Sequence, residues 1–307
     1  MKGVEALTKN WKPLIVVAIV GLLGLLATRR VLGPVYYRYR TDVHELTVED
    51  TTFSYRDLGT GAPTVVISSG VDCSKNGYHA LQEGLAKTTR VIAYDRPGTG
   101  DAPPNSEPPT LDFMIDDMKA VLEKLDAPPP YVLIGHSMGA HIIRYYANAH
   151  PEEVAGLVML DGPHEDWFRH IRDNWSKKEI DDYFVFWSIT EKDGRLLERP
   201  EYETNCDMLR GIEIDPSIPV LMFTGDNARH FRKTDPGREV DRRRWAEMQG
   251  NLIEGHPDAK HIIDFETGHW MHRDKPEEVL QEIKSFIERI GARRAAKAAR
   301  KPEVSPR

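Results

Sequence analysis

Short apolar runs alternate with amphipathic stretches along the chain from about residue 44. A short apolar run bounded by turn residues is typical of a buried strand, whereas apolar residues at intervals of three and four predict a helix. After an opening strand pair over 44–48 and 52–58, the pattern predicts buried strands over 64–68, 90–94, 131–134, 156–160, 220–224 and 261–265. It predicts helices over 81–87, 110–125, 140–148 and 276–290. Continuous apolar strands separated by helices indicate an α/β fold with a mostly parallel sheet that helices cover on both faces.

Residues that directly follow such strands are the first candidates for chemistry, because active sites in these sheets lie at the carboxyl ends of the strands. The strand over 131–134 leads into Gly135-His136-Ser137-Met138-Gly139, and a helix-like stretch follows. This is the layout of a nucleophile elbow, a tight turn that exposes a serine hydroxyl above the sheet. The two glycines let backbone segments approach closely, and the serine must tolerate a strained conformation. We therefore expect Ser137 to be reactive.

Three further segments accompany the elbow: Ser69-Gly70-Val71, Asp95-Arg96-Pro97-Gly98-Thr99-Gly100, and Gly268-His269-Trp270 before the last helix. Together the four segments resemble those of the α/β-hydrolase superfamily, and the resemblance covers about residues 45–290. It implies an α/β-hydrolase fold and an esterase- or lipase-like serine hydrolase. Such an enzyme acts most often on carboxylic esters, and related ones act on thioesters or lactones, through an acyl-enzyme intermediate.

The resemblance also implies roles for individual residues. Ser137 would be the nucleophile and His269 the base, because a hydroxyl attacks a carbonyl only when its proton is removed as the bond forms. Gly268 fits the family pattern and favours His269 over the nearby His272. The backbone N–H groups of Met138 and Val71 would form the oxyanion hole. The candidates for substrate contact are Gly70, His136, Trp167 and Trp187.

The acid that orients the histidine has two candidates. Many relatives place it three residues after a glycine beyond the strand over 220–224, where this chain has Ala228. Asp226 lies one residue after Gly225, whereas Asp161 directly ends the strand over 156–160, from which some relatives supply their acid. We favour Asp161 and keep Asp226 as the alternative. The aspartate that is not the acid is expected to cap a helix or form a turn.

About sixty residues separate the strand that ends at Leu160 from the one that begins at Val220, too many for a simple crossover. The resemblance places a helical lid there, over about 164–216. An apolar roof over the serine would exclude water and favour an apolar ester-type small molecule. The same aromatic side chains could instead form the segment's own core. They are Trp167, Phe168, Trp175, Tyr183, Phe184, Phe186 and Trp187.

Near the amino terminus, residues 14–27 form an unbroken apolar stretch between lysines and arginines. As a helix of about 21 Å it would be a marginal span of a hydrocarbon layer of about 30 Å. Arg29 and Arg30 directly after the stretch disfavour a signal cleavage site. We expect an uncleaved single-pass membrane anchor within residues 1–43, with a cleaved signal peptide and a soluble helix as alternatives. Basic residues flank both ends, so the membrane side is not readable.

Length and composition fit one hydrolase domain over 44–290, followed by a basic tail over 291–307 that we expect to be disordered. The formal net charge of −7 gives no reason to expect nucleic acid as a partner. Cys73 and Cys206 are too few for a disulfide framework or a cysteine zinc site, although one bridge is compatible with them. We expect no cofactor and no metal.

A second function is compatible with the same sequence. The missing acid at Ala228 and the apolar amino-terminal stretch would also fit a hydrolase-fold binding or scaffold protein at the membrane, with a degenerate site. The intact elbow and His269 favour the enzyme. The sequence does not reveal the oligomeric state.

Overall fold

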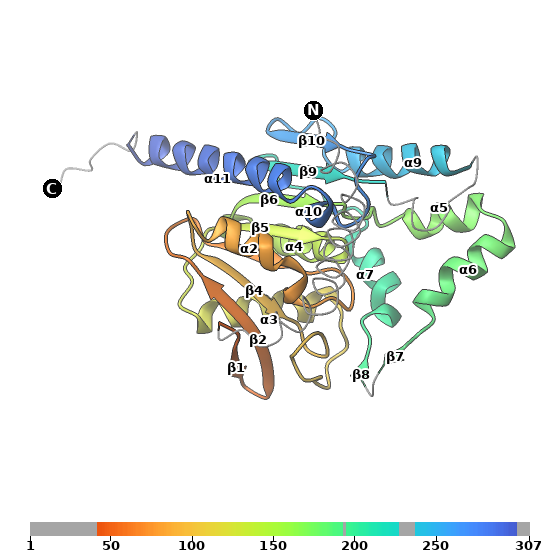
Figure 1. Ribbon diagram of the computed structural model, residues 1–307, viewed down its shortest axis with the longest axis horizontal. Coiled ribbons are helices and arrows are strands. Elements are labelled where there is room, and N and C mark those ends of the chain that lie inside the picture. The colour runs from red at the N-terminus through yellow and green to blue at the C-terminus, as the bar shows by residue number, and fades with distance from the viewer. Residues whose placement is uncertain (1–41, 193–194, 227–236, 300–307) are drawn as a thin grey trace, which may run out of the picture. The chain divides into compact units, whose positions relative to one another are not determined.

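The protein is built around one sheet of eight strands. The structure is a computed structural model that describes residues 42–192, 195–226 and 237–299. The strands lie in the order β1-β2-β4-β3-β5-β6-β9-β10 (Figure 1). Their bounds are β1 His44–Val48, β2 Thr51–Leu58, β4 Val91–Asp95, β3 Val65–Ser68, β5 Tyr131–His136, β6 Val154–Leu160, β9 Val220–Thr224 and β10 Ala259–Ile263. Within this sheet, only the β1–β2 and β2–β4 pairs are antiparallel. The predicted mostly parallel sheet is confirmed.

Helices cover both faces of the sheet, as predicted (Figure 1). Successive side chains of a strand point to opposite faces. On β3, Val66 joins the core formed with α3 (Leu111–Lys124) and α4 (Met138–Ala149), whereas Val65 and Ile67 join the core formed with α2 (His79–Leu85) and α11 (Pro276–Ala299). The sheet is therefore buried between two apolar layers, which explains why its strands carry continuous apolar runs.

Two predicted elements lie two residues later in the sequence than in the structure. The last strand, expected over 261–265, is β10, because it pairs in parallel with β9 from Ala259↔Val220 to Ile263↔Thr224. Asp264 then leaves the strand and binds Lys275. The helix expected over 81–87 is α2, and the 3-10 helix η1 (Lys75–Tyr78) leads into it.

The prediction of a disordered tail from residue 291 was wrong for its first part. Helix α11 continues to residue 299 instead of ending at 290. Residues 292–297 are alanines, arginines and a lysine, which have the highest helix propensities. Arg293 also forms an ion pair with Asp258 before β10. Residues 300–307 lie outside the described part of the chain.

A helical insertion of about sixty residues separates β6 from β9 (Figure 1). Its parts are α5 (Trp167–Asn174), α6 (Lys177–Trp187), a small hairpin of β7 (Glu191–Lys192) and β8 (Arg195–Leu196), the 3-10 helix η3 (Arg199–Glu201) and α7 (Tyr202–Leu209). We call this segment the insertion. Other short elements are the 3-10 helix η2 (Pro151–Glu153) and α10 (Met271–Asp274), and α9 (Gly237–Asn251) follows β9.

The predicted membrane anchor, residues 14–27, lies outside the described residues. Within residues 42–192, 195–226 and 237–299, no helix combines the length and apolarity needed to cross a membrane. Cys73 and Cys206 are both free thiols, so the bridge that the sequence left open is not formed.

Candidate active site

Ser137 stands at the turn between β5 and α4 with φ +54° and ψ −126°. The flanking residues must be glycines because a side chain would collide with the neighbouring backbone. A Cβ at Gly135 would lie 2.4 Å from the carbonyl oxygen of Gly139, and a Cβ at Gly139 would lie 2.2 Å from that of Ser68. His136 and Met138 are buried, whereas Ser137 is partly exposed. The strained turn thus presents the serine above the carboxyl end of β5, in the arrangement of a nucleophile elbow.

Asp161 and His269 meet at the neighbouring strand end. Asp161 follows β6, and its Oδ2 lies 2.6 Å from Nδ1 of His269. The backbone N–H of Ser137 donates to the carbonyl of Leu160 at 3.1 Å, so Ser137 and Asp161 occupy adjacent strand ends. The carboxylate is fully buried and the imidazole is 19% exposed. Because an ionised carboxylate only accepts, Nδ1 carries the hydrogen and Nε2 is left as the basic nitrogen.

The second carboxylate oxygen of Asp161 accepts three hydrogen bonds. The donors are the backbone N–H of Gly225 at 3.0 Å, Nε1 of Trp245 at 2.7 Å and Nε2 of Gln249 at 3.2 Å. Trp245 and Gln249 lie one turn apart on α9 and therefore on the same helix face. The carboxylate is held from both sides, which fixes the oxygen that faces His269.

Asp226, the alternative acid, binds elsewhere. Its Oδ2 accepts from Arg242 of α9 at 3.0 Å, and its backbone N–H donates to Thr267. Ala228 lies outside the described residues. Of the two aspartates, the structure thus brings Asp161 to His269 and Asp226 to an arginine.

The turn over 69–73 lies beside the serine. A Cβ placed on Gly70 would be 3.2 Å from Cβ of Ser137. The amides around Val71 donate within the protein: Gly70 to the hydroxyl of Tyr78 at 3.1 Å, Asp72 to Oε2 of Glu198 at 2.6 Å, and Cys73 to the carbonyl of Gly70 at 3.2 Å. Unlike these three amides, the Val71 N–H has no acceptor among the described residues. The other expected oxyanion donor, Met138, begins α4, where amides face outward at the positive end of the helix.

His136 connects the base to this turn. Its Nε2 lies 2.8 Å from the carbonyl oxygen of His269, so Nε2 donates and Nδ1 accepts from the Tyr78 hydroxyl at 2.8 Å. Burial, followed by the neighbouring His269, lowers the pKa of His136 well below its usual value. A neutral imidazole fits both bonds. Because both ring nitrogens are engaged within the protein, His136 supports the site and offers no free ring nitrogen to a substrate.

His272, the alternative base, belongs to the same aromatic cluster. Its ring stacks on Tyr78 with 4.8 Å between ring centroids. Burial lowers the pKa of His272 to about 3, so the imidazole is neutral across the physiological range. His272 is thus buried within this cluster, whereas His269 lies against the carboxylate of Asp161.

The aromatic residues of the insertion mostly pack against one another and against the core of the domain. Trp167 is 4% exposed and packs edge-on against Trp245, with 4.8 Å between ring centroids. Trp187 packs against Tyr202, with 4.4 Å between ring centroids. The two tryptophans expected to contact substrate therefore pack mainly against protein, and Phe186, which is 44% exposed, presents more surface.

Sequence patterns missed several residues that support the site. Helix α9 was not predicted, since its few apolar residues stand among charged ones, so the bonds of Trp245 and Gln249 to Asp161 were not foreseen. Arg96 follows a buried strand and is itself only 2% exposed. The position of a charged residue directly after such a strand could have indicated that Arg96 supports the site. Tyr78, which binds His136, gave none.

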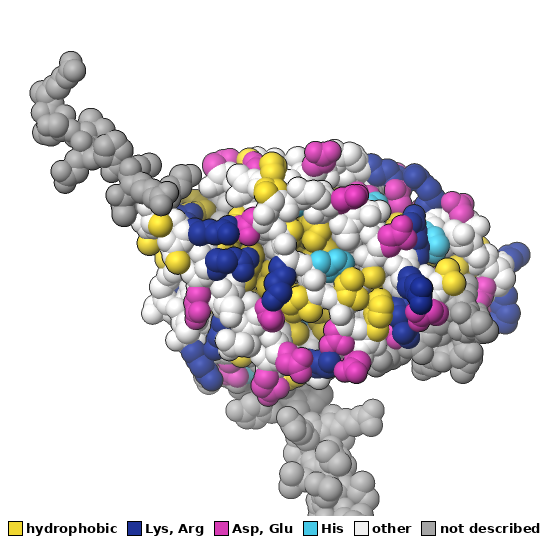
Figure 2. Space-filling view, turned by 90° about the horizontal axis from the view of Figure 1, so that it is seen from above, with side chains coloured by type: hydrophobic (Ala, Val, Ile, Leu, Met, Phe, Trp, Pro, Cys, Tyr) yellow, Lys and Arg dark blue, Asp and Glu magenta, His cyan; other side chains and the backbone are white. Residues whose placement is uncertain are grey.

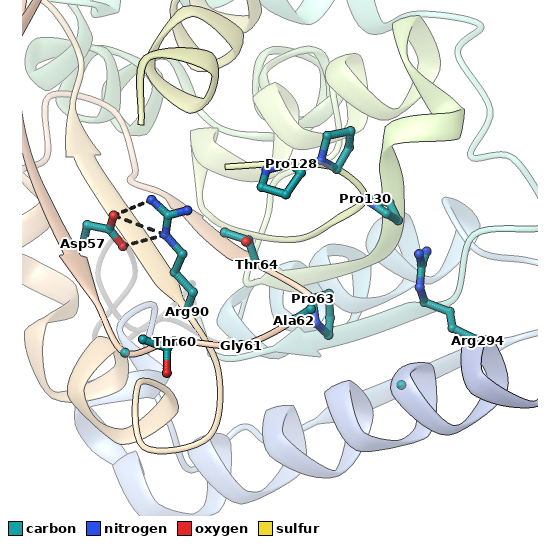
Figure 3. Close-up of a pocket in the computed structure, with 13 residues that line it drawn as sticks. Asp57, Thr60, Gly61, Ala62, Pro63, Thr64, Arg90, Pro128, Pro130 and Arg294 are labelled. Carbon is teal, nitrogen blue, oxygen red and sulfur yellow. Dashed lines mark hydrogen bonds and ion pairs between the residues drawn. The ribbon is translucent and has the colours of Figure 1, made fainter. Parts of the chain in front are cut away.

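A groove of about 630 Å³ lies at the opposite edge of the sheet, where β2 ends and β3 and β5 begin (Figure 3). One wall holds the ion pair of Asp57 with Arg90, and Arg294 of α11 reaches the other side. Turn residues, many of them glycines and prolines, form the rest of its lining. On the face of the domain seen in Figure 2, acidic and basic side chains are interspersed.

Comparison with known proteins agrees with this architecture. A sequence model of the alpha/beta hydrolase fold matches residues 63–200. The sn-1-specific diacylglycerol lipase ABHD11 of Mus musculus is 25% identical over 312 residues, which cover 87% of this chain and 96% of the lipase.

Solved structures share the fold. The alpha/beta hydrolase domain-containing protein 10 from mouse matches with a TM-score of 0.61 at 17% identity, over 81% of this chain and 99% of its own. A thermophilic esterase from Thermogutta terrifontis matches with a TM-score of 0.57 at 18% identity, over 81% of this chain and 98% of its own. The sheet order, the elbow and these likenesses agree that the chain has the α/β-hydrolase fold.

Proposed function

We propose that the protein is a serine hydrolase, of the carboxylesterase type, that cleaves an apolar carboxylic ester or a related thioester or lactone. The observation that carries the proposal is the 2.6 Å bond between Asp161 and His269, at the strand end next to the strained Ser137. Acyl transfer of this kind requires an acid that orients a base, and a base that activates a nucleophile.

In this mechanism, Nε2 of His269 removes the proton from the Ser137 hydroxyl as its oxygen attacks the ester carbonyl. Asp161 balances the positive charge that develops on the imidazole. The N–H groups of Val71 and Met138 stabilise the oxyanion. The imidazolium then protonates the departing alcohol and the acyl group stays on Ser137. Water, activated by the same imidazole, releases the acid.

The substrate is proposed to be apolar. The lipase that this chain resembles over most of its length is named for an acyl-glycerol substrate, and a solved structure with the same fold is an esterase. We propose that the insertion, over about 164–216, acts as a lid with its apolar side chains near the acyl group. Membrane attachment through residues 14–27 stays a prediction.

The alternative of a degenerate binding protein loses its main motive. It depended on the absence of an acid at Ala228, and Asp161 offers a carboxylate from a different strand. We therefore do not propose a scaffold function.

The test is hydrolysis of p-nitrophenyl esters with acyl chains from acetate to palmitate. We expect turnover by the wild type, with a preference for apolar chains, and its loss in Ser137→Ala. A folded wild type that hydrolyses none of the series, nor a matched thioester, would contradict the proposal. Equal turnover in Ser137→Ala would contradict it as well.

A further inference from the structure

Arg96 is a buried arginine, and each of its N–H groups has an acceptor. It directly follows β4, in the segment over residues 95–100, and it is 2% exposed. Its Nη1 donates to the carbonyl and the hydroxyl of Ser69 at 3.0 and 3.1 Å, and its Nη2 donates to the carbonyl of Gly70 at 2.9 Å. The guanidinium therefore holds the first two residues of the turn that contains Val71.

The remaining donors of Arg96 bind an acid from the insertion. Nε and Nη2 lie 2.5 and 2.8 Å from the two carboxylate oxygens of Glu198, a residue that is 3% exposed. This is a bidentate pair, in which the planar fork of arginine fixes direction as well as distance. Glu198 stands 102 residues away in sequence, between the β7–β8 hairpin and α7.

Glu198 also holds the far side of the same turn. Its Oε2 accepts from the backbone N–H of Asp72 at 2.6 Å, and its own N–H donates to Oδ1 of Asp72 at 2.8 Å. Val71 thus lies between Gly70, whose carbonyl binds Arg96, and Asp72, whose amide binds Glu198. One ion pair grips both neighbours of the proposed oxyanion donor.

We propose that Arg96 and Glu198 form a latch through which the insertion sets the position of the oxyanion turn. Both are positioning residues that act through Val71, and this inference rests on the proposed function. When the insertion packs against the domain, the latch directs the Val71 N–H toward the carbonyl oxygen of the substrate. When Glu198 leaves, the Asp72 amide loses its acceptor and the turn loses its fixed direction. Closure of the insertion and assembly of the oxyanion hole become one event.

The matched control is a second buried pair of the same type. Arg144 of α4 binds Glu165 at the start of the insertion with 2.9 Å between Nη1 and Oε2, and both side chains are at most 8% exposed. This pair also ties the insertion to the core, but no hydrogen bond joins it to residues 69–73. Substitution of this pair shows how the loss of a buried ion pair affects the fold when the hydrogen bonds of residues 69–73 are left intact.

The experiment compares Glu198→Gln with Glu165→Gln, using kcat and KM for a p-nitrophenyl ester. We also measure the affinity for a trifluoromethyl ketone, which forms a tetrahedral adduct with the serine and needs the oxyanion hole. We expect Glu198→Gln to lower kcat and the affinity for the ketone together by about tenfold or more, with KM nearly unchanged. Glu165→Gln should leave all three near wild type.

A double variant covers the case in which Glu198→Gln does not fold. Arg96→Met with Glu198→Met replaces the pair by apolar side chains, an exchange that often preserves stability. The latch predicts a folded protein with reduced kcat. Equal losses in the two glutamine variants, or a Met–Met protein with wild-type kcat, would overturn the latch. A wild type that neither turns over esters nor binds the ketone would instead reject the proposed function.

Discussion

The two edges of the sheet differ in how deeply their charged side chains are buried. At the carboxyl edge, Ser137 and Asp161 have positive φ values of 54° and 48°, and Asp161, Arg96 and Glu198 are buried and fully hydrogen-bonded. At the amino edge, a groove of about 630 Å³ is lined by turn residues and by the Asp57–Arg90 pair, whose side chains are 23% and 21% exposed. Buried charged groups with complete hydrogen bonding distinguish the carboxyl edge.

The largest effect should come from the acid at the carboxyl edge. We expect Asp161→Asn to lower kcat by about 10⁴-fold, because the amide no longer orients the imidazole or balances its charge. Asp226→Asn is the matched control, since this aspartate is equally buried but binds Arg242. Its turnover should stay close to wild type in steady-state assays. A crippled Asp226→Asn beside an active Asp161→Asn would assign the acid to Asp226.

The indole of Trp245 should have the next largest effect. Trp245→Phe keeps an aromatic ring but removes the donor to Asp161, a bond to a charged group worth about 1.5–3 kcal/mol. We expect kcat to fall by about ten- to a hundredfold. Trp175→Phe removes a similar bond of 3.0 Å, to Asp241, within the same aromatic cluster. Equal kcat values in these two variants would show that the support from α9 has no part in catalysis.

Buried histidines near the carboxyl edge should make the fold sensitive to acid. Burial lowers the pKa of His141 to about 4, from 6.5 for an ordinary imidazole. Between these values the unfolded chain binds a proton that the folded protein does not. The free energy of unfolding should therefore fall as pH drops below 6.5, by up to about 1.4 kcal/mol per pH unit for each such histidine.

Urea unfolding at pH 7.5, 6 and 5 measures this dependence. His141 donates from Nε2 to the carbonyl of Pro163 at 2.9 Å, and glutamine offers a donor of similar reach. His141→Gln should reduce the slope by about one proton. An unchanged slope in that variant would mean that His141 takes up its proton equally in both states.

The smallest effect is expected at the amino edge. Arg90→Gln removes the ion pair with Asp57, which is partly exposed, so we expect a loss of less than about 1 kcal/mol of unfolding free energy. Turnover should be unchanged. A marked loss of turnover in a stable Arg90→Gln protein would break the contrast between the two edges.

Sequence patterns predicted what is local and repetitive. The buried strands had apolar runs that face two cores, and the elbow had glycines that a tight turn requires, so both could be read from neighbouring residues. Asp161 was preferred over Asp226 because it directly ends a strand from which some relatives supply their acid. Contacts between distant segments could not be read in this way. Glu198 reaches Arg96 across 102 residues, and α9 has too few apolar positions to give a helical period.

The most direct test of the central claim is the identity of the residue that becomes acylated. The protein is treated with a fluorophosphonate, which reacts with activated serines, and the site of the adduct is mapped by mass spectrometry of its peptides. The account predicts one adduct, on Ser137, absent in Ser137→Ala and formed far more slowly in Asp161→Asn. A folded protein that carries no adduct, or one labelled at another serine, would contradict it.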